Sequence, residues 1–239
     1  MKVTRPSPIA HRGLGLAVAT ALLVAACSAF EPAPTATLTP AAAATPAPTA
    51  TAEPCPPASP PVAWTNGQTA TVTLDTTQGK IVIAVDGQLA PHATANFVAL
   101  AACGFYDGVI FHRIVPGFVI QGGDGIFGRV PMVQWARVGS GGPNYTIQDD
   151  PVTTPYGRGV VAMARTSEPN SQGSQFFVVL SDDNTDSLDA ANTYAILGKV
   201  TSGMEAVDAI AALPNTGPTR YAPTTDPPPT ITKATVTRP

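Results

Sequence analysis

The chain has 239 residues, of which 44% are hydrophobic and 12% charged, and its formal net charge is −3. That length is enough for one well-buried domain together with appended segments. Because the chain is weakly acidic and contains no basic stripe that would neutralise phosphates, its charge gives no case for nucleic-acid binding.

Residues 1–26 have the pattern of a signal peptide. Basic residues precede a run of 14 residues, 13–26, that is almost wholly apolar. This run is short for a membrane span but typical of the hydrophobic part of a signal peptide. It ends in Val-Ala-Ala before Cys27, which resembles the bacterial lipobox, whose cysteine is lipidated and becomes the mature N-terminus. The alternative is an ordinary cleavage site beside an incidental cysteine. Two acyl chains on Cys27 would anchor the protein to the bacterial cell membrane, on its extracytoplasmic side.

Residues 27–63 have the composition of a disordered linker. Ten prolines lie between positions 31 and 61, among alanine and threonine. Such a segment buries too little apolar surface to offset the entropy of ordering it. We therefore expect a partly polyproline spacer that holds the folded part, residues 64–239, away from the membrane.

The globular pattern begins with a hairpin and a helix. Residues 72–74 and 81–85 alternate between apolar and polar or small side chains around a Thr-Gln-Gly turn, which predicts a hairpin with one buried face. Pro91 suits the first turn of a helix, and Gly104 suits the position that ends it.

Most of the remaining chain consists of strand-like runs separated by turn residues. A second short helix is predicted at 204–213, and the strands are predicted at 109–115, 117–121, 159–165, 175–180, 194–200 and 230–236. About eight strands and two helices predict a mostly β protein built as a barrel. In so small a barrel side chains fill the interior, so a binding site would lie on the outer face.

One arginine, Arg113, lies in an apolar run that reads FHRIVPGFVIQGGD over residues 111–124. No acidic residue occurs from Gly108 to Gly123, although a guanidinium on apolar surface needs hydrogen-bond acceptors. Gln121 is the nearby side-chain amide that could accept from it. Taken alone, the pattern is explained most simply by an arginine that reaches solvent from an edge strand.

Further segments share the order and spacing of one protein family. They are Asn96-Phe97, the run GFYDG at 104–108, the run 160–177, Leu188-Asp189 and the run 194–200. Together with the Arg113 segment, over roughly residues 69–236, they resemble the cyclophilin-type peptidyl-prolyl cis-trans isomerases. The resemblance implies a closed eight-stranded antiparallel barrel capped by a helix at each end, with no cofactor and no metal.

The resemblance also implies, residue by residue, a site for a proline-containing polypeptide. Arg113 matches the catalytic arginine, and Gln121 and Gln175 would position it and hold the substrate backbone. Ala164 and Arg165 would pair with the peptide main chain. The proline ring would lie in an apolar pocket made by Phe118, Val119, Phe177, Leu188 and Tyr194.

Neighbouring side chains carry other expectations. We expect Phe111 and Phe176 to belong to the barrel core, and core is also the simpler alternative for Phe118 and Phe177. His112 lies beside the site, but we assign it no proton-transfer role.

Several positions depart from the residues usual in the family. Ser187 stands where tryptophan is frequent and Tyr194 where histidine is, while Val119 and Arg165 replace methionine and asparagine. None of these changes removes the catalytic arginine or the aromatic side chains of the pocket. We therefore expect them to change the affinity for the peptide and for inhibitors such as cyclosporin, rather than catalysis.

The loop of residues 125–140 is longer than the usual family loop by roughly ten residues. It is also apolar for a loop, with Ile126, Phe127, Met132, Val133 and Trp135. It could fold over the site and contact residues that flank the proline, or it could pack against the barrel.

Other functions have less support. The run GDGIFG at 123–128 matches a dinucleotide-binding fingerprint, but the prolines and glycines that follow it prevent the helix that this fingerprint requires. The three histidines and the scattered cysteines offer little for a metal site. No Gly-x-Ser-x-Gly run indicates a hydrolase.

The expected function is therefore isomerisation of Xaa-Pro peptide bonds, assisting the folding of exported proteins, by a monomer held at the membrane through its lipid. A proline-peptide binding module without relevant turnover is the alternative from another class, and a structural envelope tether is a third. Arg113 together with Gln121 favours the enzyme, because a binding module needs no donor directed at the imide nitrogen.

Lipidation of Cys27 would leave two cysteines, Cys55 and Cys103, in an oxidising compartment. We expect them to form a disulfide that joins the end of the linker to the first helix, the alternative being two free thiols.

Overall fold

The computed structural model describes residues 55–65, 67–220 and 222–239. The predicted signal peptide, Cys27 and most of the predicted linker lie outside these residues.

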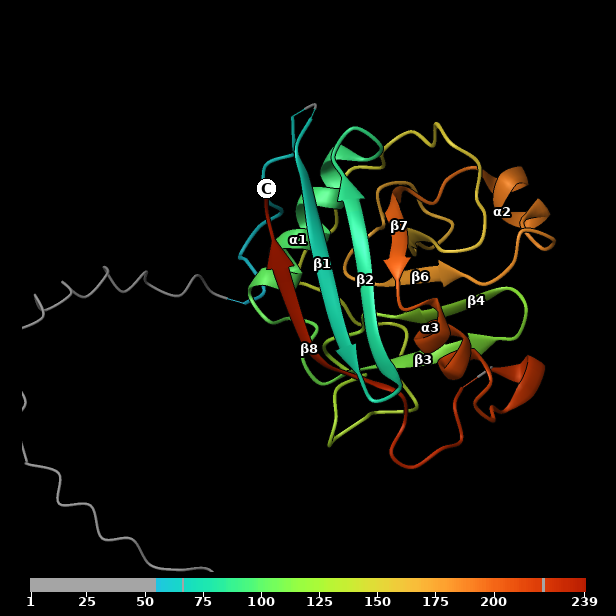
Figure 1. Ribbon diagram of the computed structural model, residues 1–239. Coiled ribbons are helices and arrows are strands. Elements are labelled where there is room, and N and C mark those ends of the chain that lie inside the picture. The colour runs from blue at the N-terminus through green and yellow to red at the C-terminus, as the bar shows by residue number, and fades with distance from the viewer. Residues whose placement is uncertain (1–54, 66, 221) are drawn as a thin grey trace, which may run out of the picture. The chain divides into compact units, whose positions relative to one another are not determined.

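Eight strands close into one barrel in the order β1-β2-β7-β5-β6-β4-β3-β8, with every neighbouring pair antiparallel (Figure 1). The predicted closed eight-stranded barrel is confirmed. Its strands are β1 (Thr69–Thr76), β2 (Gly79–Asp86), β3 (Val109–Val115), β4 (Val119–Gly122), β5 (Val160–Met163), β6 (Phe176–Val179), β7 (Ile196–Ser202) and β8 (Thr230–Thr237).

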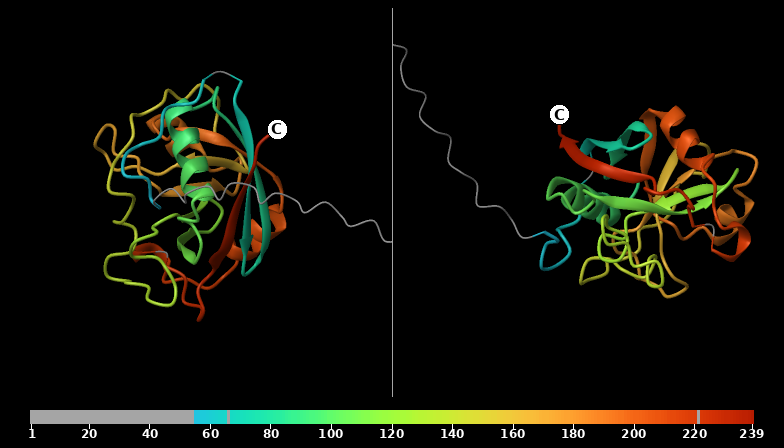
Figure 2. Two further views of the ribbon diagram at one scale, coloured as in Figure 1. Left: turned by 90° about the vertical axis from the view of Figure 1, so that its left-hand side faces the viewer. Right: turned by 90° about the horizontal axis from the view of Figure 1, so that it is seen from below.

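Two helices cover opposite ends of the barrel. Helix α1 (Pro91–Ala102) follows β2 and packs against β8 and β7. Helix α3 (Met204–Ala211) lies at the other end, where Ala206 faces Gly79 at the β1–β2 turn. The views in Figure 2 show α1 and α3 on opposite sides of the strands. Within the part of the chain that the structure describes, no helix combines the length and apolar character needed to cross a membrane.

A third helix, α2 (Asp186–Ala191), was not predicted, and a short 3-10 turn, η1 (Gly217–Thr219), precedes β8. Helix α2 has six residues, of which Leu188 is the buried one. So short a segment cannot show the helical periodicity on which the prediction relied. It ends at Asn192, whose φ of 46° is left-handed, a conformation that asparagine adopts more readily than most residues.

Apolar side chains fill the interior of the barrel. The aromatic part of this core centres on Phe176 of β6, whose ring meets those of Phe97, Tyr106 and Phe111 edge-on at centroid distances of 5.2, 5.5 and 6.2 Å. All four rings are fully buried. Phe111 and Phe176 are therefore core residues, as predicted.

A β-bulge in β3 places Phe111 and Arg113 on different faces of the barrel wall. Phe111 pairs with Gly122 of β4, and Arg113 pairs with Gln121, so His112 is the extra residue on its strand. In an undistorted strand, residues two apart share a face, which would turn Arg113 inward together with Phe111. The bulge changes the direction of the strand, and Arg113 lies partly exposed while Phe111 is in the core.

A second apolar cluster covers the outer face of β4, β5, β6 and β7. Its buried members include Val119, Ala162, Phe177 and Ile196, which alternate along their strands with residues of the interior core. Phe118, Ala164 and Tyr194 are partly buried against this cluster, and the cluster's full set of buried residues is Val119, Tyr156, Ala162, Phe177, Val179, Leu188 and Ile196. The barrel therefore carries an apolar surface outside its own core, where a ligand can reach it.

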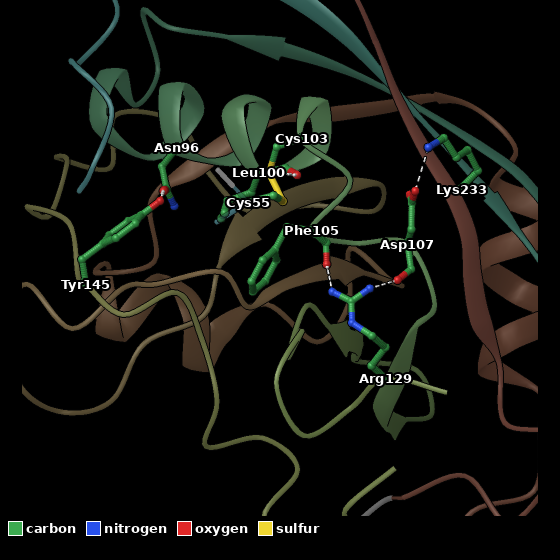
Figure 3. The surroundings of a disulfide bond; sticks show 9 residues. All are labelled: Cys55, Asn96, Leu100, Cys103, Phe105, Asp107, Arg129, Tyr145 and Lys233. Atoms are coloured by element: carbon green, nitrogen blue, oxygen red, sulfur yellow. Dashed lines mark hydrogen bonds and ion pairs between the residues drawn. A yellow bond between two sulfur atoms is a disulfide. The ribbon is translucent and has the colours of Figure 1, made fainter. Parts of the chain in front are cut away.

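A disulfide joins Cys55 to Cys103, the residue that follows helix α1 (Figure 3). The two cysteines lie 48 positions apart in the sequence, with Cα atoms 5.5 Å apart. At the other end of this segment, the Trp64 N–H donates to the Pro91 carbonyl at 3.0 Å. Residues 55–63 are thus tied to the domain at both ends, whereas the sequence placed them in a disordered linker.

Loss of this disulfide is expected to lower stability without abolishing the fold. Cys103→Ser should lower the free energy of unfolding by about 2 kcal/mol, because a crosslink that closes a long loop restricts the unfolded chain. Intact-mass measurement after thiol alkylation should show no free thiol at Cys55 or Cys103 in the native protein. Two alkylated thiols in the native protein would contradict the pairing.

Candidate active site

A cavity of about 340 Å³ opens on the outer face of the barrel, over the outer apolar cluster. It brings together residues from β3, β4, β6, the segment that follows β5 and the segment around α2, which are far apart in the sequence. Nine of the ten predicted catalytic and substrate-binding residues line it, together with Ser187: Arg113, Phe118, Val119, Gln121, Ala164, Arg165, Phe177, Leu188 and Tyr194. The tenth, Gln175, lines an adjoining cavity that shares Gln121, Ala164 and Arg165 with the first.

The apolar wall of this cavity is held by a tyrosine that sequence reasoning missed. The rings of Phe177 and Tyr194 meet edge to face, with centroids 5.5 Å apart. Below them, the Tyr156 hydroxyl donates to the Tyr194 carbonyl at 2.8 Å and accepts from its N–H at 3.1 Å. Burial raises the pKa of Tyr156 to about 12, so its hydroxyl keeps its proton at neutral pH. Tyr156 is thus a positioning residue for Tyr194.

The opposite rim comes from the β3–β4 turn and helix α2. The Asn184 side-chain amide donates to the Gly117 carbonyl at 2.9 Å, and the Leu180 N–H donates to the Phe118 carbonyl at 2.8 Å. These bonds fix the turn that presents Phe118. Helix α2 presents Leu188, which is buried, beside Ser187, which is exposed.

A chain of amide hydrogen bonds runs from the long loop to the strand that faces Arg113. The Gln175 Nε2 donates to the carbonyls of Gly139 and Gly141, both at 2.9 Å. The Gln175 Oε1 in turn accepts from the Gln121 Nε2 at 3.0 Å. Because this bond uses the amide nitrogen of Gln121, its Oε1 is the atom that can accept from a guanidinium, and Arg113 is its cross-strand partner.

The two ends of the long loop meet at a buried carboxylate, Asp124. Its Oδ1 accepts from the N–H groups of Ile126 and Phe127 at 3.1 and 2.8 Å. Its Oδ2 accepts from those of Gly139 and Gly141 at 2.8 and 2.9 Å. Gly139 and Gly141 are therefore held between Asp124 on one side and Gln175 on the other.

The loop also packs along the barrel before it returns to the site. Arg129 pairs with Val109 in an isolated bridge, and its guanidinium donates to the carbonyls of Phe105 and Asp107 (Figure 3). It also donates to the Gly125 carbonyl. Of the two alternatives left by the sequence, packing against the barrel is observed, and contact with residues that flank a bound proline stays a prediction. The first half of the loop packs on the barrel, and the return reaches the cavities beside Arg113.

The predicted main-chain contacts at Ala164 and Arg165 need refinement. The Ala164 N–H already donates to the Gln175 carbonyl at 2.8 Å, so a peptide would use the Ala164 carbonyl. The Arg165 guanidinium, with a side chain 8% exposed, donates to Asp149 at 2.8 Å and to the Glu168 carbonyl at 2.8 Å. Its charge therefore stabilises its own loop.

His112, the bulge residue, is uncharged at neutral pH. Its pKa is lowered to about 4, mainly by burial; the carboxylate of Asp124 opposes the shift and the nearby Arg113 guanidinium adds to it. With so low a pKa the imidazole offers no general acid for chemistry near pH 7. Among the described residues, no group of three or more His, Cys, Asp or Glu side chains could hold a metal ion.

Comparison with known proteins decides the family. Residues 71–236 match the family described as cyclophilin type peptidyl-prolyl cis-trans isomerase/CLD. The chain belongs to this family. It is accordingly a cyclophilin-type peptidyl-prolyl cis-trans isomerase, EC 5.2.1.8.

Relatives from bacteria and from a eukaryotic parasite resemble this cyclophilin. A probable peptidyl-prolyl cis-trans isomerase of Brucella abortus is 41% identical over 142 residues, which cover 59% of this chain and 70% of the relative. Peptidyl-prolyl cis-trans isomerase A of Dickeya dadantii is 40% identical over 157 residues, covering 64% and 77%. The crystal structure of a Cryptosporidium parvum cyclophilin in the presence of the dipeptide Ala-Pro has a TM-score of 0.58 and 28% identity, covering 70% of this chain and 98% of the other.

Proposed function

We propose that this cyclophilin isomerises Xaa-Pro bonds of exported proteins, with Arg113 as the catalytic donor and the outer cavity as the proline pocket. The observation that carries the proposal is the composition of that cavity. A partly exposed guanidinium lies at the edge of a pocket whose other side chains are mostly apolar or aromatic. The pocket suits a proline ring, and a proline bound there would bring the bond that has to rotate beside the guanidinium.

The chemical problem is rotation about a bond with partial double-bond character, against a barrier of about 18–20 kcal/mol. In the twisted state, resonance is lost and the proline nitrogen becomes a better hydrogen-bond acceptor. A guanidinium fixed beside that nitrogen donates more strongly to the twisted state than to either planar state, which lowers the barrier. No covalent intermediate and no net proton transfer are needed.

The amide chain that ends at Gln121 supports this role for Arg113. A donor accelerates the reaction only if it is already oriented when the bond twists. Gln121 faces Arg113 across the β3–β4 pair and is itself held by Gln175. In this proposal Gln121 and Gln175 are positioning residues, and Arg113 contacts the reacting group.

NMR exchange spectroscopy on a short Ala-Pro peptide, with and without the purified protein, tests the activity. We expect cross-peaks between the cis and trans forms to appear at a catalytic amount of protein, because uncatalysed exchange takes tens of seconds or longer. Binding of the peptide without faster exchange would instead support a proline-peptide binding module.

We further propose that the enzyme works at the outer side of the bacterial cell membrane, anchored through a lipidated Cys27. The support is the sequence pattern of residues 1–26, since Cys27 lies outside the described residues. Membrane fractionation tests this: the natural protein should partition with the membrane and a Cys27→Ser variant should not. Equal partitioning of both would refute the lipid anchor.

The serine at position 187 is expected to weaken cyclosporin binding. Ser187 lines the proline pocket, while Trp135 lines a different cavity and so does not replace the missing indole. Ser187→Trp should tighten cyclosporin binding by about tenfold, because an indole adds a donor and apolar area at the rim. Calorimetry on both proteins measures the change, and unchanged affinity would refute it.

A further inference from the structure

A second cavity beside Arg113 has a volume of about 200 Å³. It shares Arg113 and Gln121 with the proline pocket. When the proline of a peptide lies in the proline pocket, a neighbouring residue of that peptide can therefore reach the second cavity. Its other walls come from the long loop and from the turn after η1. The complete lining is His112, Arg113, Gln121, Trp135, Val138, Gly139, Arg220 and Ala222.

Both outer walls of this second cavity are fixed by hydrogen bonds. In the long loop, the Val138 N–H donates to the Gln134 carbonyl at 2.9 Å, and Gly139 is bound to Asp124. In the turn, the Thr216 N–H donates to the Ala222 carbonyl at 2.8 Å, and the Ala222 N–H donates to the Thr216 hydroxyl at 3.2 Å. These bonds fix Val138, Gly139 and Ala222, three of the residues that line the cavity.

The charged residues that line the second cavity are both basic. Two guanidiniums, those of Arg113 and Arg220, line it, and none of its lining residues is acidic. The imidazole of His112 is neutral at pH 7 because burial lowers its pKa to about 4. Val138, Ala222 and the indole of Trp135 supply apolar contacts, and the indole N–H is a further donor.

We propose that this second cavity is a specificity subsite for an acidic side chain within two positions of the isomerised proline. A carboxylate matches the guanidinium fork of Arg220 and the positive charge of Arg113. The methylene groups of a glutamate would contact Val138 and Ala222. The inference rests on the proposed function, since it names the substrate sequence that the same site prefers.

The test compares matched proline-containing peptides in which one position carries Glu, Gln, Phe or Lys, placed one or two positions before or after the proline. At one of these positions we expect kcat/KM for Glu to exceed that for Gln by roughly fivefold, the scale of a partly exposed ion pair. Because such pairs are screened by salt, the ratio should shrink in about 0.5 M NaCl. Exchange NMR gives the rate for each peptide.

Two variants assign the preference to the second cavity. Arg220→Gln should bring the ratio of kcat/KM for the Glu peptide to kcat/KM for the Gln peptide close to one. A change in overall activity affects both peptides equally and leaves this ratio unchanged. Arg137→Gln is the matched control. Arg137 lies in the long loop that forms one wall of the second cavity, but its guanidinium lies 3.7 Å over the Phe127 ring and it lines neither the second cavity nor the proline pocket. It should keep the ratio of the natural protein, and thermal unfolding checks that both variants fold.

The outcomes separate this inference from the proposed function. Fast exchange of the neutral peptide with equal rates for Glu and Gln at every position would overturn the acidic subsite alone. A higher rate for Phe or Lys than for Glu would also overturn it. Absence of catalysis on every peptide would overturn the proposed function, and the subsite with it.

Discussion

Arg113→Ala is expected to lower the isomerisation rate constant by about a hundredfold, which corresponds to roughly 2.7 kcal/mol of activation free energy. The proline pocket remains in this variant, so peptide binding should weaken less than turnover. Arg113→Lys should recover little, because an ammonium is strongly hydrated and lacks the planar fork that Gln121 can orient. The rates are measured by exchange NMR on the Ala-Pro peptide.

Stability should change little in these variants, because Arg113 lies partly exposed on the outer face and its truncation opens no cavity in the core. Arg238→Ala is the matched control, since this exposed arginine follows β8 and lies near Trp64, away from the proline pocket. A folded Arg113→Ala protein with full activity would show that the pocket acts by desolvation alone.

The barrel could be predicted because its strands have the simplest sequence signal. Inward and outward residues alternate along β1, β2 and the second half of β8, and turn residues separate the runs. Helix α2 could not be predicted, because six residues with one buried side chain carry no period. The position of residues 55–63 was not predicted, since their composition is that of a linker, although the disulfide between Cys55 and Cys103 was expected.

The members of the proline pocket were predictable only through resemblance to a family. Nothing in the run around Arg113 reveals the bulge at His112 that separates this arginine from the face of Phe111. Once the barrel closes, outer residues of β3, β4 and β6 meet over one cavity. The alternation pattern says which residues share a face, but the register says which of them touch.

The supporting residues had no sequence signal at all. Tyr156 lies 38 positions before the residue that it holds, Tyr194, and Asp124 binds Gly139 and Gly141 across a loop. Such contacts depend on where a loop returns, which local propensities do not encode. The pairing of Gln121 with Gln175 is likewise set by the β4–β6 contact.

Asp124→Asn is expected to lower the free energy of unfolding by about 3 kcal/mol, although it changes a single atom. Each carboxylate oxygen of Asp124 accepts from two backbone N–H groups. Whichever way an asparagine amide is turned, its NH2 group therefore faces two donors. Two buried hydrogen bonds are lost, and donors are forced together where the loop closes. Thermal unfolding should show a fall in Tm of about 10 °C.

The same variant should also lose activity, and this distinguishes a role in the site from a purely structural one. Gly139 and Gly141 offer their carbonyls to Gln175, which holds Gln121 opposite Arg113. If the carboxylate no longer holds the two glycines, that chain of amides loosens and kcat/KM should fall by about tenfold at a temperature where the variant is folded. Asp183→Asn, an exposed aspartate in a surface turn, is the control and should change neither quantity. An Asp124→Asn protein that is destabilised yet fully active would show that Gln121 orients Arg113 without help from the loop.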